Sequence, residues 1–284
     1  MAKAKRLLLE NMKLVDVVVE LRDARIPEAS ANPLLAKIMG RKPRIVVLAK
    51  TDLADSEQTK AWLTYFEQVE RTKAVGLNLK GRNEATRLLL PQVKALADPL
   101  VPRSKQGNFP LRPARTMIVG IPNIGKSTLI NSLAGRATAK TGALPGVTRQ
   151  KQWIKLSDGS ELLDTPGILW PKLDDPLVAR QLAVTGAIGQ GGFDEYELAT
   201  WLLHYLANNF PALLARYKLT DTDLPGAELL EAVGRARGCL IAGGNVDLSR
   251  AADIVLSDFR SGKLGPVTLE SPPRRGNKRE NEDV

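Results

Sequence analysis

The fold of this chain is decided by Gly120-Ile-Pro-Asn-Ile-Gly-Lys-Ser-Thr128, which matches the phosphate-binding loop pattern G-x-x-x-x-G-K-[ST]. Glycines let such a loop point its backbone N–H groups at a polyphosphate, and the N-terminus of the following helix adds positive potential. Lys126 then reaches the β- and γ-phosphates and Ser127 ligates Mg²⁺. A β-rich run at 115–119 precedes the loop, and the run 129–133 suits a helix. This context favours a phosphate-binding loop over a plain glycine turn.

The composition is that of a globular protein with ample chain for a core. Its 284 residues are 43% hydrophobic and 25% charged, which suits one large domain or two of ordinary size. No apolar run reaches the ~18 residues of a membrane span, and the apolar stretch near the start is too short for a signal peptide, so we expect a cytoplasmic protein without membrane attachment. The single Cys239 excludes an internal disulfide framework, and with the single His204 it argues against a zinc site.

The charge is strongly positive and unevenly distributed. The formal net charge is +10, with +13 in residues 1–174 and −3 from Asp175 onward. A positive potential of this size attracts phosphate backbones, so we expect a polyanionic partner. The simpler alternative is a basic surface that serves only solubility.

Hydrophobic patterning predicts an α/β domain followed by a helical one. The expected strands are 14–21, 44–48, 74–77, 115–119, 151–156 and 161–163, the last two forming a hairpin. The expected helices between them are 33–39, 56–70, 83–97 and 129–133. After Pro176 only helical segments follow, at 177–188, 194–206, 211–217, 226–237 and 247–261. We therefore predict an α/β domain over 1–175 with a mostly parallel sheet and helices on both faces, a Pro-rich linker at about 98–113 inside it, an all-helical domain over 176–270, and a disordered tail over 271–284.

Two further segments supply what a nucleoside triphosphatase needs besides a phosphate cradle. Asp164-Thr-Pro-Gly167 follows the strand at 161–163, so the Asp164 carboxylate can reach the Mg²⁺ shell through water and the Gly167 N–H can meet a γ-phosphate oxygen. Thr148 lies in the loop between, where its hydroxyl can ligate Mg²⁺ only when the triphosphate is present, as in a switch. In this order and spacing the segments predict a GTPase core.

Two Lys-x-Asp stretches compete for guanine recognition, which normally uses [NT]-K-x-D after a strand. Lys172-Leu-Asp174 has no strand before it, whereas Lys50-Thr-Asp52 directly follows the strand at 44–48. We therefore assign base recognition to Lys50, Thr51 and Asp52. The segment Gly76-Leu-Asn78 after the next strand would supply a backbone N–H to guanine O6.

The base-reading segments thus precede the phosphate loop, which is the order of a circularly permuted GTPase, and a linker at 98–113 can rejoin the old ends. With this order the chain resembles the circularly permuted ribosome-assembly GTPases. The matching residues are 23–27, 50–52, 120–131, 145–149, 164–167, 243–250 and 262–265. The likeness runs in unbroken order to about Leu269.

The resemblance implies GTP-driven maturation of the large ribosomal subunit, with the helical domain helping to grip ribosomal RNA and the protein acting as a monomer off the ribosome. The expected nucleotide-binding residues are Lys50, Thr51, Asp52, Gly76, Leu77, Asn78, Asn123, Ile124, Gly125, Lys126, Ser127, Thr128 and Gly167. The expected metal ligands are Ser127, Thr148 and, through water, Asp164. Hydrolysis is expected to depend on Asn123, Lys126, Thr148 and Gly167, and to be slow unless the subunit stimulates it.

Three positions depart from the pattern of such enzymes or bear on catalysis. Ala49 stands where the base tetrad usually has Asn, so one supporting hydrogen bond is missing. Ile168 stands where Ras-like enzymes place a water-orienting Gln, so another group must assist. In GTPases similar to this one, an Asn at the position of Asn123 helps to hold a K⁺. From the sequence, a simple role as a turn residue explains the presence of Asn123 equally well. Family members often carry a short segment ending in His before the position of Met1. Either the start of this sequence is truncated or this His, a candidate for assisting catalysis, is absent.

Two alternatives remain at this point. The first is an RNA-binding assembly factor that uses GTP only as a conformational ligand, with negligible hydrolysis. The second is a metabolic or transport ATPase, which would prefer adenine.

Overall fold

A computed structural model describes residues 2–81, 83–105, 110–135, 152–164, 175–189, 192–219 and 221–273. Thr148, Gly167, Ile168 and the tail beyond residue 273 lie outside these ranges, as does the side chain of Asp164. The chain divides into two compact units, one formed by Met1–Pro171 with Thr268–Val284 and the other by Lys172–Val267. We call them the GTPase-like unit and the helical unit.

The GTPase-like unit is built on a six-stranded sheet in the order β3-β2-β1-β4-β6-β5. The strands are β1 (Val17–Asp23), β2 (Arg44–Ala49), β3 (Lys73–Leu77), β4 (Arg115–Val119), β5 (Gln152–Lys155) and β6 (Glu161–Asp164). All neighbours pair in parallel except β5, which forms an antiparallel hairpin with β6 at one edge. The predicted mostly parallel sheet is confirmed.

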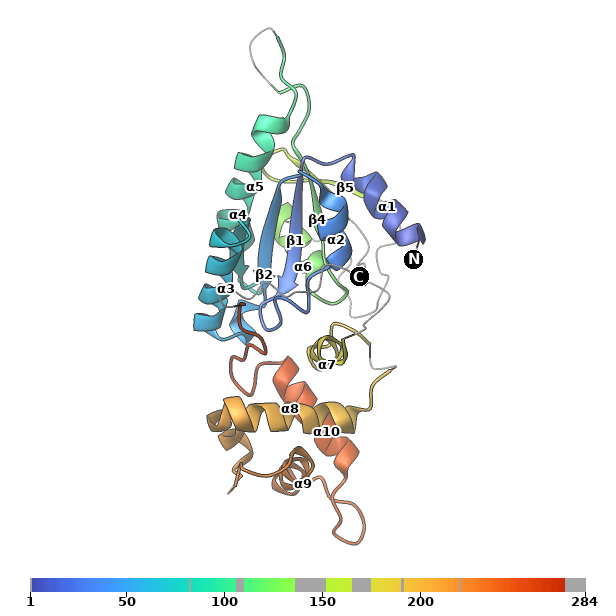
Figure 1. Cartoon of the computed structure of the whole chain (residues 1–284), viewed down its shortest axis with the longest axis vertical. Coiled ribbons are helices and arrows are strands. Elements are labelled where there is room, and N and C mark those ends of the chain that lie inside the picture. The colour runs from blue at the N-terminus through green and yellow to red at the C-terminus, as the bar shows by residue number, and fades with distance from the viewer. Residues whose placement is uncertain are drawn as a thin grey trace. The chain divides into compact units, whose positions relative to one another are not determined.

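Helices cover this sheet, with α2 in front of it and α6 behind it in Figure 1. The helical segments are α1 (Ala2–Met12), α2 (Pro33–Met39), η1 (Thr51–Leu53), α3 (Ser56–Gln68), α4 (Glu84–Leu88), α5 (Leu90–Ala97), η2 (Asp98–Leu100) and α6 (Lys126–Ala134). Trp62 and Phe66 of α3 pack on Val46 and Leu48 of β2 in one core cluster. The alternation of inward side chains along β2 therefore fixes where α3 lies.

The N-terminal helix α1 was not predicted from the sequence. Its Leu8 and Met12 lie four residues apart, so both face the sheet and join a buried cluster with Val18 and Met117. The charged residues Lys3, Lys5 and Arg6 obscured this short apolar stripe. Helix formation here depends on tertiary packing rather than on local propensity.

Two other segments differ from the sequence prediction. The helix expected over 83–97 is divided into α4 and α5 at Leu89, because Pro91 in the first turn of α5 has no N–H to donate to the preceding turn. The linker is partly fixed by Arg112, whose guanidinium binds the carboxylate of Asp16 through Nη1 at 2.8 Å and Nη2 at 2.7 Å. Arg112 is therefore engaged within the protein.

The helical unit contains α7 (Pro176–Val184), α8 (Glu195–Asn209), the 3₁₀ segment η3 (Pro211–Tyr217), α9 (Gly226–Ala236) and α10 (Leu248–Arg260). Asp175, Asp194 and Asp247 cap the starts of α7, α8 and α10 by accepting backbone N–H bonds. None of the described helices in either unit combines the length and apolarity needed to cross a bilayer.

The end of the described chain returns to the GTPase-like unit. The Leu269 N–H donates to the Arg25 carbonyl at 2.7 Å, and the Trp62 indole N–H donates to the Glu270 carbonyl at 3.2 Å. The Glu270 carboxylate accepts the N–H groups of Glu28 at 2.6 Å and Ala29 at 3.0 Å. Because of these bonds, residues 268–270 belong with the sheet, whereas the sequence had placed the end of the helical domain at 270. We call residues 268–270 the C-terminal clamp.

Candidate nucleotide-binding site

The predicted nucleotide-binding segments gather at one edge of the sheet. Lys50–Asp52 follow β2, Asn78 follows β3, and Asn123–Thr128 follow β4 and enter α6. Since β1 to β4 are parallel, their carboxyl ends share one edge, which is where open α/β sheets bind ligands.

The phosphate loop passes very close to the neighbouring strand β1. A Cβ at position 120 would lie 2.8 Å from the Leu21 carbonyl oxygen, so only glycine fits there without a backbone shift. Within the loop, Asn123 has φ of 55° and Gly125 has φ of 109°. Asn tolerates this left-handed conformation better than most residues, which agrees with a turn role for Asn123.

Lys126 begins helix α6 and folds back over the loop. Its Nζ donates to the carbonyls of Gly120 at 3.2 Å and Ile121 at 2.8 Å. The N–H groups in the first turn of a helix have no intrahelical acceptor, so the N–H groups of Ser127 and Thr128 are suited to an anion. The loop thus combines an ammonium, free helix donors and a hydroxyl.

The three loops touch one another. A Cβ at Gly125 would lie 2.8 Å from Leu79 Cδ1, which places the loop after β3 against the phosphate loop. A Cβ at Gly76 would lie 3.2 Å from Thr51 Cγ2, which places the end of β3 against the loop after β2. Segments separated widely in the sequence therefore form one continuous site.

Lys50 is held by a buried ion network. Its backbone has φ of 60°, and its Nζ lies 3.0 Å from Asp23 Oδ2. Arg25 binds the same carboxylate through Nη2 at 2.8 Å and Nε at 3.0 Å. Burial alone would raise the pKa of Asp23, but Arg25 and Lys50 outweigh it and hold the pKa well below its usual range. Asp23 is therefore ionised and fixes Lys50.

The neighbouring base-loop residues are also positioned by polar contacts. Asp52 Oδ2 lies 2.9 Å from Lys80 Nζ. The Asn78 N–H donates to Glu84 Oε2 at 3.1 Å, and the Asn78 side-chain oxygen accepts the Lys80 N–H at 3.0 Å. Ala49, which replaces the usual Asn, is buried and offers its carbonyl to the Ala24 N–H at 2.9 Å.

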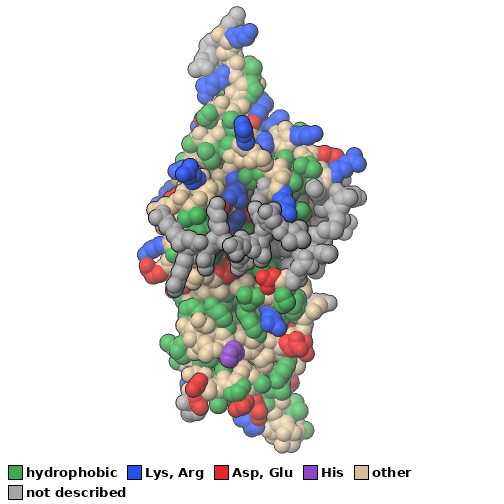
Figure 2. Space-filling model, viewed as in Figure 1, with side chains coloured by type: hydrophobic (Ala, Val, Ile, Leu, Met, Phe, Trp, Pro, Cys, Tyr) green, Lys and Arg blue, Asp and Glu red, His purple; other side chains and the backbone are tan. Residues whose placement is uncertain are grey.

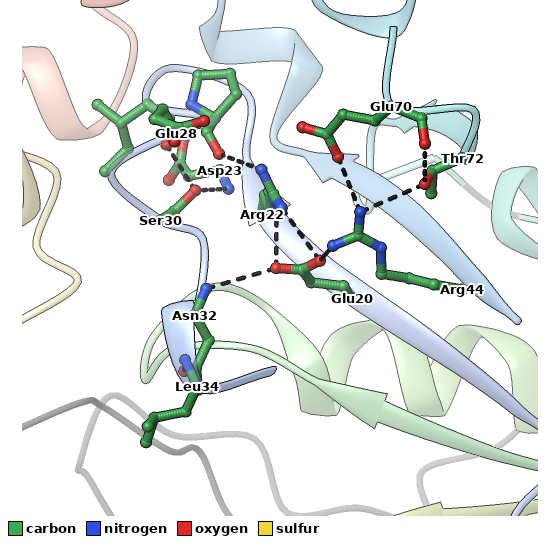
Figure 3. A network of polar contacts seen from close by, with 12 residues as sticks. Glu20, Arg22, Asp23, Glu28, Ser30, Asn32, Leu34, Arg44, Glu70 and Thr72 are labelled. Atoms are coloured by element: carbon green, nitrogen blue, oxygen red, sulfur yellow. Dashed lines mark hydrogen bonds and ion pairs between the residues drawn. The ribbon is translucent and has the colours of Figure 1, made fainter. Parts of the chain in front are cut away.

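A second ion network joins Glu20 and Arg22 of β1 to Arg44 of β2 (Figure 3). Arg22 binds Glu20 through Nε at 3.1 Å and Nη2 at 3.2 Å, and Arg44 Nη1 binds the same carboxylate at 2.8 Å. Burial raises the pKa of Glu20, but Arg22 and Arg44 outweigh it, and the pKa stays below its usual value. This network explains how a strand predicted as apolar at 14–21 runs instead from Val17 to Asp23.

The remaining predicted site residues are placed only in part. Thr148 and Gly167 lie outside the described residues, and of Asp164 only the backbone is described, at the end of β6. Sequence reasoning assigned no role to four residues of this site: Asp23, Arg25, Leu79 and Lys80. A signal existed for the first two, because Asp23-Ala-Arg25 follows a buried strand, where functional side chains often lie.

Comparison with known proteins gives a consistent picture. Residues 115–195 match the family described as "50S ribosome-binding GTPase". The chain is 45% identical over 280 residues to ribosome biogenesis GTPase A of Bacillus cereus, covering 97% of this chain and 93% of the relative. It is 32% identical to mitochondrial ribosome-associated GTPase 1 of Bos taurus, covering 95% of this chain and 86% of the relative.

Solved structures agree with the fold. The chain is similar to the GDP-bound TM YlqF structure with a TM-score of 0.70 and 28% identity, covering 93% of this chain and 98% of that one. It is similar to GNP-bound YlqF from T. maritima with a TM-score of 0.66 and 29% identity, covering 95% of this chain and 98% of that one. These comparisons confirm the predicted P-loop GTPase fold and favour hydrolysis of GTP over the two alternatives raised by the sequence. The chain belongs to the ribosome biogenesis GTPase A family and is a guanine-nucleotide-binding, GTP-hydrolysing ribosome assembly factor.

Proposed function

We propose that this GTPase binds precursors of the large ribosomal subunit in its GTP state and leaves them after hydrolysis. The observation that carries the proposal is the meeting of the loops after β2, β3 and β4 at one sheet edge, where Leu79 contacts the phosphate loop. A change at the γ-phosphate can therefore reach the base-reading segments through direct packing. The family description "50S ribosome-binding GTPase" supports the choice of subunit.

Each loop has a defined part in nucleotide binding. Asp52 accepts from the guanine N1 and N2 donors, and Lys50 lays its stem along the ring. The segment Gly76-Leu-Asn78 supplies a backbone N–H to O6, and if Asn78 is the donor its N–H exchanges the bond to Glu84 for one to the base. Asn123–Thr128 wrap the phosphates, with Lys126 on the β- and γ-phosphates.

The metal part of the proposal uses oxygen donors, which suit Mg²⁺. Ser127 offers its hydroxyl beside Lys126 at the start of α6, a donor arrangement that fits Mg²⁺ bound together with phosphates. Thr148 and Asp164, the latter through water, complete the set in the triphosphate state, and the Gly167 N–H contacts the γ-phosphate. When bound, the cation neutralises charge that develops on the phosphates.

The chain order is that of a circularly permuted GTPase. Strand β2 and its base-reading loop come before β4 and the phosphate loop, and residues 98–113 connect the two halves. A consequence of this order is that the proposed switch segments come directly before the helical unit in the sequence, and the helical unit is the part proposed to help grip ribosomal RNA.

The helical unit offers a positively charged cluster for that contact. Arg216 Nε lies 2.8 Å from Asp258 Oδ2, and Arg237 and Lys263 lie 3.6 and 3.8 Å from the same carboxylate. One carboxylate cannot neutralise three cations, so the cluster keeps positive charge for a phosphate backbone. Lys3, Lys5 and Arg6 at the start of the chain are further candidates. We propose that the protein works as a cytoplasmic monomer off the ribosome.

Catalysis requires a group other than the usual Gln, because Ile168 stands at that position and an apolar side chain cannot orient water. We propose that Asn123 holds a K⁺ near the β/γ bridge. The expected result is faster GTP hydrolysis in KCl than in NaCl at equal ionic strength, and an Asn123→Ala variant that no longer distinguishes the two salts. Equal rates for the wild type in both salts would reject the role of K⁺.

The subunit proposal is tested by sedimentation of the protein with isolated large subunits in GDP, in a non-hydrolysable GTP analogue, and without nucleotide. We expect the analogue to give the strongest co-sedimentation. A Lys126→Ala variant should lose the nucleotide dependence, whereas Lys94→Ala, which removes a lysine from the surface of α5, should retain it. Binding that ignores the nucleotide in the wild type would argue against the switch.

A further inference from the structure

A basic groove lies at the amino-terminal edge of the sheet, opposite the nucleotide loops. It has a volume of about 440 Å³ and is formed where α2 ends, where β2 and β3 begin, and near the end of α5. Five of its ten lining residues are Arg41, Lys42, Arg44, Arg71 and Lys73, and none is acidic. We call it the amino-edge groove. Figure 2 shows many Lys and Arg side chains on the visible face of the GTPase-like unit.

Two of these cations are held within the protein and form the floor of the groove. Arg44 binds Glu20 at 2.8 Å and Glu70 at 2.8 Å, as Figure 3 shows. The Lys42 ammonium donates to the Val15 carbonyl. Arg44 is therefore neutralised by carboxylates, whereas Lys42 meets a neutral carbonyl and keeps its positive charge, and the lining itself contains no carboxylate.

The other three cations are exposed and have no acidic partner among the described residues. These are Arg41 and Arg71 in the turns before β2 and β3, and Lys73 at the start of β3. Arg71 has φ of 51°, an unfavourable conformation for a side chain of this kind and one that is common at functional positions. Arg41, Arg71 and Lys73 line the same hollow without a carboxylate partner among the described residues, so positive charge is concentrated there.

We propose that the amino-edge groove binds the phosphate backbone of RNA, a site that rests on the proposed binding to the large subunit. The lining contains no aromatic residue that could stack on bases. We therefore expect the groove to contact the RNA backbone without recognising a base sequence. Guanidinium and ammonium groups without carboxylate partners release counterions when they meet phosphates, which favours RNA over a protein surface of mixed charge.

The groove can be occupied while a nucleotide is bound. Arg44 and Ala49 stand at opposite ends of β2, and five steps of about 3.3 Å separate the two edges of the sheet by roughly 17 Å. The two sites therefore do not compete for space.

The test replaces Arg41, Arg71 and Lys73 together by Gln and measures binding to isolated large subunits over a series of salt concentrations. Three lost phosphate contacts should reduce the slope of log affinity against log salt by about 2 to 3. When the salt is raised from 50 to 200 mM, the factor by which affinity falls should then be roughly 20 to 40 times smaller for the variant than for the wild type. The matched control replaces three exposed cations of the same unit outside the groove, Lys60, Arg87 and Lys94, by Gln as well. This control should keep the wild-type slope.

Unchanged intrinsic GTP hydrolysis and thermal melting will show that the groove variant is folded. If the wild type does not bind large subunits, the proposed function fails. If the wild type binds and the groove variant keeps its slope, or changes no more than the control, the groove assignment fails alone. If the variant loses binding to subunits but not to protein-free rRNA extracted from them, the groove takes a ribosomal protein and the RNA assignment is wrong.

Discussion

Glu20 is a charged residue in the middle of a strand that is buried on both faces. Its carboxylate accepts from Arg22 and Arg44, and the Arg22 guanidinium also lies 5.0 Å from the centre of the Phe66 ring. Burying such charges is costly unless every partner is present, because an unpaired ion in the interior retains its full desolvation penalty. The network therefore makes β1 dependent on a single carboxylate.

We predict that Glu20→Gln lowers the free energy of unfolding by about 3–5 kcal/mol at pH 7, because Arg22 is left buried without its counterion. Chemical denaturation measures this change. Glu57→Gln is the control, since it breaks an exposed pair worth about 0–1 kcal/mol. Because the pKa of Glu20 is lowered by folding, its contribution should be present above about pH 4.5 and decrease as the pH falls. Equal effects of the two substitutions would contradict this account.

Asp23 connects the ion networks to the nucleotide. We predict that Asp23→Asn weakens GTP and GDP binding by roughly 10- to 100-fold, the effect of losing a charge-assisted contact of about 1.5–3 kcal/mol that fixes Lys50. Asp16→Asn is a suitable control, because Asp16 is also buried and bound to an arginine, Arg112, but lies at the opposite edge of the sheet. Titration with a fluorescent guanine nucleotide measures both. Similar losses in both variants would indicate a general effect on stability.

At the scale of elements, the junction of β1 with the phosphate loop leaves no room for a side chain. Gly120→Ala should force the loop away from the Leu21 carbonyl and reduce nucleotide affinity by at least tenfold, an energy of about 1.4 kcal/mol. Gly135→Ala, at the end of α6, has open space around it and should affect only backbone strain. Isothermal titration with GDP compares them, and an unaffected Gly120→Ala variant would show that the loop can move freely.

Elements with their own local signal were predictable from the sequence. The strands β2, β3 and β4 lie within a residue of the predicted ranges, because each is a short apolar run that ends in a recognisable motif. Strand β1 was misplaced because its charged residues are paired with partners distant in the sequence, such as Arg44. Helix α1 was missed because its buried apolar residues Leu8 and Met12 can be recognised as a core face only together with the sheet that they cover.

The candidate site was predictable to a similar extent. The motifs identified the loops that meet at the carboxyl edge, since a motif specifies its own backbone. The contacts between loops were not predictable, for example Leu79 on the phosphate loop or Lys80 on Asp52, because they depend on the order of strands in the sheet. The pairing of Lys50 with Asp23 was hidden for the same reason.

At the scale of the whole molecule, the C-terminal clamp gives stability a dependence on pH. Burial raises the pKa of Glu270 to about 7, although the N–H groups of Glu28 and Ala29 favour its charged form. In the unfolded chain its pKa is about 4.5, so between these values the folded protein binds more protons than the unfolded one. The stabilisation is complete below about pH 4.5 and is lost as the pH rises toward 7.

We therefore predict that the wild type loses about 2–3 kcal/mol of unfolding free energy between pH 4.5 and pH 7 relative to Glu270→Gln. Denaturant titrations at several pH values measure the difference between the two proteins. Asp16, Glu20 and Asp23 do not contribute in this window, because folding lowers their pKa values. A constant difference across the range would mean that Glu270 is ionised throughout.

The clamp also determines when the fold can be completed during synthesis. Glu270 binds the N–H of a residue 242 positions earlier in the chain. A ribosome adding about 5–20 residues per second needs roughly 12 to 48 s to cover that separation. Throughout this interval the nascent sheet carries Trp62 and the turn at Glu28 without their final partners. The contacts of Glu28 and Trp62 with the C-terminal clamp can therefore form only after residues 172–267 of the helical unit have been synthesised, so the last polar contacts of the sheet domain wait for a domain that is inserted between its two parts of the chain.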